Sequence, residues 1–285
     1  MADAVERMKE AGIFKRVKIV FFNSLFSNEL GYNSLKTHAE KVRIFDSALS
    51  SLEENYDPDL ILIGCNTLSV IYEETLFSKK TEIPVVGIVD AGVELISENL
   101  KETPNSVVII FATQTTVEEG NHKKKLVEQG FGPKRIITQP CSDLVNYIER
   151  GYRSDETEML ISACVDEALQ KVQNPKLLLY VSLNCTHFGY SLDLWKKAFE
   201  AQGLEPLDFL NPNSKMIDFL FDPKRHKLFK RTEIQTRVVS MVEISREKIE
   251  SIGEWLRKIS PETASSLESY ELKRNLFEWR KYIIK

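Results

Sequence analysis

Short apolar runs rich in β-branched residues alternate along the chain with longer amphipathic segments. The runs at 17–22, 60–64, 84–89, 107–112, 135–139, 177–183 and 237–244 predict strands. Apolar residues three and four positions apart predict helices at 35–55, 91–101, 117–130, 154–173, 191–202 and 245–259, the last capped by Ser245, and we expect a further charged helix at 262–285. This alternation predicts an α/β fold with mainly parallel sheets.

Two polar, proline-containing stretches divide the pattern. "ISENLKETPNS" separates two strand-rich halves, and "EPLDFLNPNS" follows the second half. We therefore expect two similar α/β domains, the first discontinuous (1–95 plus 208–285) and the second formed by 96–207. Ligands of parallel sheets sit at the carboxyl ends of the strands.

The composition narrows the class of ligand. The chain has 285 residues, 42% of them hydrophobic, and its 38 basic and 42 acidic residues give a net charge of -4 without long blocks of one sign. This charge pattern argues against a nucleic-acid partner, and no apolar stretch is long enough to span a membrane. We expect a cytoplasmic protein that binds a small molecule.

The four cysteines are widely spaced. Cys65, Cys141, Cys164 and Cys185 include no CxxC pair, which suits neither a disulfide framework nor a zinc site. We expect free thiols and no bound metal.

Two of these cysteines follow predicted strands. Cys65 directly follows "LILIG" and is followed by Asn66 and Thr67. Cys185 directly follows "LLLYVSLN" and is followed by Thr186 and His187. Two thiols on opposite sides of a ligand suit proton exchange at one carbon, with a thiolate removing a proton and a thiol delivering one. Neighbouring groups must tune both, because a free thiol is only a few per cent ionised at neutral pH.

The neighbours of the two cysteines supply suitable groups. His187 can act as proton partner of Cys185 or stabilise its charged form. Asn66, Thr67 and Thr186 are donors that can hold a carboxylate, together with backbone N–H groups at the following helix starts.

At these residues the chain resembles the aspartate/glutamate racemase superfamily, from about residue 19 to 260. "GCNTLS" and "LNCTHF" resemble its two catalytic cysteine motifs, "FATQTTVEEG" its Thr-x-x-Thr loop, and "PCSDLVNYIERG" its Leu-Val segment ending in Glu-x-Gly. "IPVVGIVDAG" is similar to the stretch after the first motif. Thr186 and His187 favour the glutamate branch of the superfamily.

The resemblance implies a cofactor-independent isomerase of two α/β domains with the active site in the cleft between them. It makes Cys65 and Cys185 the acid/base pair and His187 the partner of the second cysteine. It further implies that Asn66, Thr67, Thr116, Thr186 and the loop tyrosine Tyr32 contact substrate. Cys141 and Cys164 match no catalytic position and are expected to be structural.

The implied reaction interconverts L- and D-glutamate, which would supply D-glutamate for peptidoglycan; a homodimer is also implied. The family's N-terminal Asp-Ser-Gly strand has no counterpart, and we expect either an internal-start fragment or a degenerate paralogue. Two alternatives follow: a racemase of aspartate, another amino acid or a hydantoin, and an inactive paralogue that binds an amino acid.

Overall fold

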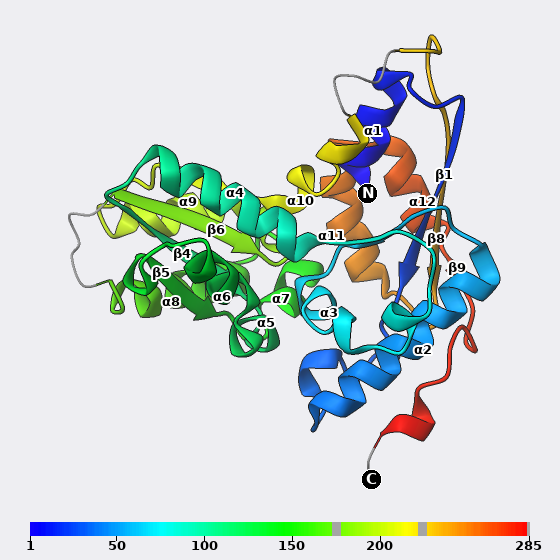
Figure 1. Cartoon of the computed structure of the whole chain (residues 1–285), viewed down its shortest axis with the longest axis horizontal. Coiled ribbons are helices and arrows are strands. Elements are labelled where there is room, and N and C mark those ends of the chain that lie inside the picture. The colour runs from blue at the N-terminus through cyan, green and yellow to red at the C-terminus, as the bar shows by residue number, and fades with distance from the viewer. Residues whose placement is uncertain (173–177, 222–226, 284–285) are drawn as a thin grey trace. The chain divides into compact units, whose positions relative to one another are not determined.

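The chain divides into two compact units. The computed structural model describes residues 1–172, 178–221 and 227–283, so Leu177 of one predicted strand lies outside the described residues (Figure 1). Unit 1 comprises Met1–Ile61, Ile71–Pro84 and Ile217–Lys285, and unit 2 comprises Leu62–Val70 and Val85–Met216. The short segment Leu62–Val70, expected in the first domain, packs with unit 2 because helix α3 (Asn66–Ser69) contacts helices of that unit.

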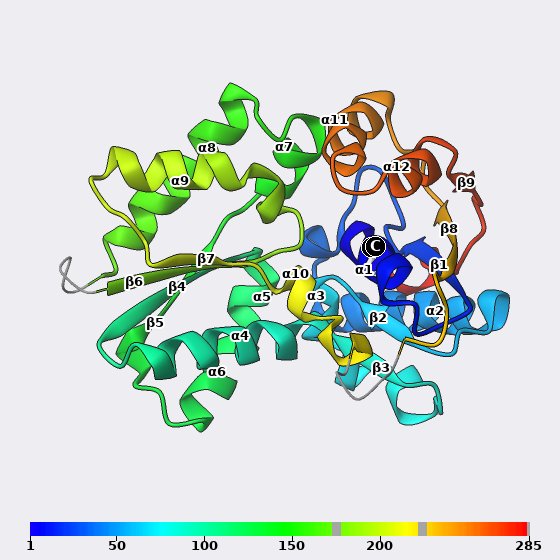
Figure 2. The same cartoon turned by 90° about the horizontal axis from the view of Figure 1, so that it is seen from above.

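Unit 2 is built on a four-stranded sheet. Its order is β5 (Ile136–Pro140), β4 (Ser106–Ala112), β6 (Leu178–Asn184) and β7 (Asp208–Leu210), and every neighbouring pair is parallel. Helices cover both faces of this sheet (Figure 2). Every residue of β4 is buried, which explains its almost unbroken apolar sequence.

The helices of unit 2 form two layers. Figure 2 shows α4 and α6 on one face of the sheet and α8 and α9 on the other. Their bounds are Ile88–Glu102 for α4, Gln114–Glu119 for α5, Asn121–Glu128 for α6, Leu144–Arg150 for α7, Asp155–Leu169 for α8, Leu192–Ala201 for α9 and Pro212–Lys215 for α10. The Thr113 and Ser154 side chains cap α5 and α8 by accepting backbone N–H bonds.

Unit 1 contains a three-stranded parallel sheet. β1 (Arg16–Asn23) pairs along its whole length with β8 (Glu233–Ser240), and β8 pairs with β9 (Glu271–Leu272). The helices are α1 (Ala2–Ala11), α2 (His38–Tyr56), α11 (Arg246–Arg257) and α12 (Pro261–Glu268). β2 (Ile61–Ile63) and β3 (Val85–Gly87) form a separate two-stranded sheet.

Most of the predicted elements are confirmed. The fold is α/β with parallel sheets, all seven predicted strands are present, and Ser245 caps α11 by accepting from the backbone N–H of Lys248. β8 begins at Glu233, earlier than predicted, and the short strand β7 was not predicted. No helix within the described ranges has the length and apolarity needed to cross a membrane.

The prediction of one charged helix over 262–285 is wrong. α12 ends at Glu268, and the chain continues through β9 into an irregular tail. Phe277 of the tail packs on Phe22, with ring centroids 6.0 Å apart, and Trp279 packs on Phe26 at 5.1 Å. Burial of these aromatic rings outweighs the helical tendency of the segment.

Candidate active site

The carboxyl ends of three strands of unit 2 are aligned. In the sheet register Ala112 of β4 lies beside Pro140 of β5 and Asn184 of β6. The next residues along each strand are Cys141, Thr113 and Cys185, which therefore form a row at the edge of the sheet. This is the edge where parallel sheets bind ligands.

Cys185 has a histidine partner that is itself held by a carboxylate. The Sγ atom of Cys185 lies 4.0 Å from Nδ1 of His187, and Nε2 of His187 lies 3.1 Å from Oε1 of Glu149 on α7. The ring of Tyr190 meets the imidazole edge-on, with centroids 5.6 Å apart. The imidazole is thus fixed between a sulfur and a carboxylate.

The environment of His187 favours its charged form. Burial lowers the pKa of the imidazole, but hydrogen bonds to Cys185 and Glu149 outweigh it and raise the pKa well above its usual value. His187 is therefore an imidazolium at neutral pH and donates from both ring nitrogens. A cation that donates to a cysteine sulfur favours the thiolate, the reactive form of cysteine.

Cys65 is the half-buried residue that precedes α3. Burial of the sulfur raises its pKa, and the electrostatic interaction with Cys185 adds to this; the backbone N–H groups of Leu68 and Thr67 and the interaction with His187 act in the opposite direction. The net pKa is raised, so Cys65 is a protonated thiol at neutral pH. The two thiols interact electrostatically and differ in environment, which is what an acid/base pair requires.

A chain of buried hydroxyl groups connects the start of α3 to the loop after β4. The Oγ1 atoms of Thr67 and Thr113 are 2.7 Å apart, and those of Thr113 and Thr116 are 3.0 Å apart. Thr113 thus occupies the middle of the chain as well as capping α5. These contacts tie the segment that carries Cys65 to the edge of the sheet.

Asn66 and Thr186 also belong to unit 2. Asn66 is 2% exposed, and neither polar atom of its amide has a hydrogen-bond partner within the described residues. The carbonyl of Thr186 accepts from Nδ2 of Asn213 at 3.0 Å. Asn66 therefore offers an uncommitted donor and acceptor directly after Cys65.

Tyr32 lies in unit 1, in a short 3₁₀ helix (Tyr32–Ser34). Its ring is buried and meets Phe26 and Phe45 edge-on, with centroids 5.2 and 6.5 Å apart. Its assignment as a substrate contact stays a prediction.

Two residues of the candidate site were not predicted. Glu149 lies in the segment whose resemblance was noted, but only folding shows that its carboxylate reaches His187. Thr113 directly follows a predicted strand, a position that could have singled it out. No group of three or more metal-ligating side chains gathers around Cys65, Cys185 and His187 in the described part of the chain.

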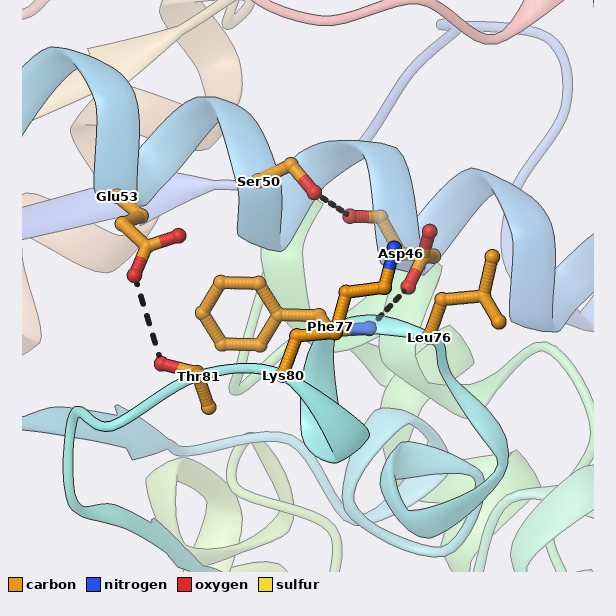
Figure 3. A pocket seen from close by; sticks show the side chains of 7 residues that line it. All are labelled: Asp46, Ser50, Glu53, Leu76, Phe77, Lys80 and Thr81. Atoms are coloured by element: carbon orange, nitrogen blue, oxygen red, sulfur yellow. Dashed lines mark hydrogen bonds between the residues drawn. The ribbon is translucent and has the colours of Figure 1, made fainter.

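A shallow hollow in unit 1 offers less chemistry. Figure 3 shows its lining: Asp46, Ser50, Glu53, Leu76, Phe77, Lys80 and Thr81. Asp46 accepts from the backbone N–H of Phe77 at 2.7 Å, and Thr81 donates to Glu53 at 3.5 Å. The lining contains no thiol or histidine, and Asp46, Ser50, Glu53 and Thr81 take part in hydrogen bonds within it, so we place the candidate site at the cysteines.

The chain is similar to curated glutamate racemases. It is 28% identical to that of Persephonella marina over 142 residues, which is 50% of this chain and 51% of the relative. It is 28% identical to that of Fusobacterium nucleatum over 178 residues, or 61% of this chain and 62% of the relative. The chain thus spans about half to three-fifths of the length of these relatives.

Solved structures share the fold. A glutamate racemase from Francisella tularensis, in complex with D-glutamate, superposes with a TM-score of 0.65 at 17% identity, covering 91% of this chain and 90% of that one. A glutamate racemase from Campylobacter jejuni gives 0.64 at 19% identity, covering 90% and 94%. Residues 16–198 match the family described as Asp/Glu/Hydantoin racemase. Because that match covers more than half of the chain, the protein belongs to the Asp/Glu/hydantoin racemase family.

Proposed function

We propose that the protein interconverts L- and D-glutamate by proton transfer between Cys65 and Cys185, without a cofactor. The observation that carries this proposal is that one unit contains both Cys65 and Cys185, with the sulfur of Cys185 4.0 Å from Nδ1 of a histidine that is paired with Glu149. The choice of glutamate rests on the similarity to glutamate racemases. In a bacterium the reaction would supply D-glutamate for peptidoglycan.

The reaction begins with Cys185 as thiolate and Cys65 as thiol. The thiolate removes the α-proton from one face of the amino acid, while Cys65 delivers its proton to the other face. The product has inverted configuration, Cys185 is a thiol and Cys65 is a thiolate. The opposite enantiomer then reacts in the reverse direction, so the two thiols alternate as base and acid.

The α-proton of an amino acid is weakly acidic, so the negative charge that develops must be stabilised. We assign this role to donors of Asn66, Thr67, Thr116 and Thr186, which would hold the α-carboxylate. We propose Tyr32 as a further substrate contact. Glu149 and His187 set the charge at Cys185.

The test is deuterium exchange in D₂O, followed by NMR at the α-position with each glutamate enantiomer. Both enantiomers should exchange and the optical rotation should decay to zero. Failure of glutamate to exchange at high enzyme concentration would exclude this substrate. Cys65→Ser/Cys185→Ser is the matched control for contaminating racemase.

Another acidic amino acid or a hydantoin is the second candidate substrate, because the matched family includes such racemases. Chiral chromatography of a panel of enantiopure substrates would rank them. A third candidate is an inactive protein that binds an amino acid. It would show a raised melting temperature with ligand and no α-proton exchange.

A further inference from the structure

The other two cysteines of unit 2 lie against each other. Cys141 follows β5, Cys164 is on α8, and their side chains are hydrogen-bonded. Both are free and buried, with 2% of Cys141 and 8% of Cys164 exposed. We refer to Cys141 and Cys164 as the dithiol pair.

The packing of α8 on β5 sets this pairing. Two residues before Cys141, Nε2 of Gln139 donates to Oε2 of Glu167 at 2.7 Å, and Lys171 donates to Oε1 of Gln139 at 2.6 Å. Gln139 and Cys141 point to the same side of the strand, and Cys164 and Glu167 lie on one face of the helix. The Gln139–Glu167 bond therefore aligns Cys141 with Cys164.

The dithiol pair is connected through the chain to the catalytic histidine. Cys141 is held at the sheet edge because its N–H donates to the carbonyl of Ala112 at 2.9 Å. Asp143, two residues later, has φ +60°, a left-handed conformation that non-glycine residues rarely adopt. α7 starts at the next residue and carries Glu149, which holds His187.

We propose that the dithiol pair is a modification site, which peroxide closes to a disulfide, and that closure slows racemisation by displacing α7. The effect on racemisation rests on the function proposed above, whereas the closure itself does not. A disulfide requires the two sulfurs to approach to about 2.05 Å. This movement pulls on the turn at Asp143, which has little freedom to adjust, and shifts Glu149 away from His187.

The chemistry balances with one molecule of hydrogen peroxide. The sulfur of Cys164, the more exposed of the two, attacks a peroxide oxygen; the O–O bond breaks, water leaves and a sulfenic acid forms. The sulfur of Cys141 attacks the sulfenic sulfur, the S–O bond breaks, and the hydroxyl leaves with the thiol proton as a second water. Two thiols lose two electrons and two protons, and peroxide is reduced to two waters.

Burial and the contact with Cys164 raise the pKa of Cys141 well above its usual value. Cys141 therefore stays protonated at neutral pH, which slows its oxidation. Closure should accelerate as the pH rises from about 7 to 9, because the thiolate is the attacking form.

The first experiment detects closure without activity. The full chain carrying Cys65→Ser and Cys185→Ser keeps only the dithiol pair, and is treated with hydrogen peroxide, alkylated in denaturant and digested. A peptide linking Cys141 to Cys164, lost when Cys164→Ser is added, is the expected result. If Cys141 and Cys164 are recovered on separate peptides, each alkylated or oxidised to sulfinic acid, the proposed site is wrong.

The second experiment measures the consequence. Wild type and Cys164→Ala receive the same peroxide exposure, with glutamate present to shield Cys65 and Cys185. After peroxide, the racemisation rate of wild type should fall by a factor about tenfold larger than the rate of Cys164→Ala falls. Dithiothreitol should restore the wild-type rate. Equal losses in the two proteins would overturn the effect on α7. If wild type does not racemise glutamate at all, the proposed function is wrong. The presence or absence of the peptide linking Cys141 to Cys164 then still tests whether the dithiol pair closes.

Discussion

The imidazole of His187 is ion-paired with the carboxylate of Glu149, with 3.1 Å between Nε2 and Oε1. The two residues come from separate elements, Glu149 from α7 and His187 from the loop after β6. Because the other ring nitrogen faces Cys185, the carboxylate acts on the cysteine through the ring. The proposed role of Cys185 would therefore depend on a residue that need not touch substrate.

Replacing Glu149 with Gln should reduce kcat on the order of 10- to 100-fold. Glu149 raises the pKa of His187, so the imidazole stays protonated to a higher pH than a free imidazole would. Without the carboxylate the pKa falls, and the loss of activity at high pH should begin at lower pH. The pH profile of kcat measures this shift. Glu158→Gln on α8, whose carboxylate pairs with Lys197, is the matched control and should leave the profile unchanged.

Cys65→Ser and Cys185→Ser should each abolish racemisation, because a hydroxyl is a far poorer base than a thiolate and inversion needs both groups. Each variant should still exchange the α-proton of the single enantiomer that faces its remaining thiol. Exchange by Cys65→Ser should be the faster, because it retains Cys185 with its His187 partner. Deuterium incorporation from each enantiomer checks this. Wild-type racemisation by either variant would show that the thiols are not the acid/base pair.

Thr113→Val should lower kcat by about tenfold, because it removes the hydroxyl that connects Thr67 to Thr116 and so loosens the segment carrying Cys65. Thr113→Ser keeps the hydroxyl and should retain most of the activity. The Val variant also loses the α5 cap and two buried hydrogen bonds, so its melting temperature should fall as well. The kcat values are therefore compared at a temperature well below the melting transition of both variants. Equal activity of the Val and Ser variants would contradict a role for the hydroxyl chain.

His122 should limit stability in acid. Its side chain is 3% exposed, and burial lowers its pKa from 6.5 to about 4. The folded state favours the neutral ring, so the contribution to stability is fully present above pH 6.5 and is lost as the pH falls towards 4. This amounts to about 3 kcal/mol. Urea unfolding of wild type and His122→Phe at both ends of the range should give a difference in unfolding free energy that changes with pH; a difference that is the same at both ends would contradict this role of His122.

Much of the scaffold was predictable because its pattern is local. β4 and β6 are almost entirely buried, so their apolar runs are unbroken, and the residues that end them stand out as polar or nucleophilic. This is why Cys185 and His187 could be selected before the fold was known, whereas Cys65 stood out after the short apolar run that forms β2. Short β7 has no such run, and the tail after Glu268 is ordered by aromatic contacts with distant Phe22 and Phe26.

The partners of these residues were harder to predict, because they depend on packing between elements. The sequence around Glu149 does not indicate whether its carboxylate faces solvent or another side chain. In the fold, α7 places this carboxylate beside His187. The contact between Cys141 and Cys164 likewise arises from the way α8 lies on β5. The sequence singled out candidate groups, and the fold shows which of them lie close enough to influence one another.

The position of Leu62–Val70 in unit 2 has a consequence for dissecting the gene. An expression fragment covering Val85–Met216 would encode Cys185, His187, Glu149 and the whole four-stranded sheet, yet would omit Cys65. On the mechanism proposed above, such a fragment would keep the base for one face of an amino acid and lack the thiol that inversion needs. Proteolysis between Val70 and Val85 would cut the chain between the two thiols, and the segment with Cys65 would then be held in unit 2 only by non-covalent contacts such as those of α3 with α4 and α5.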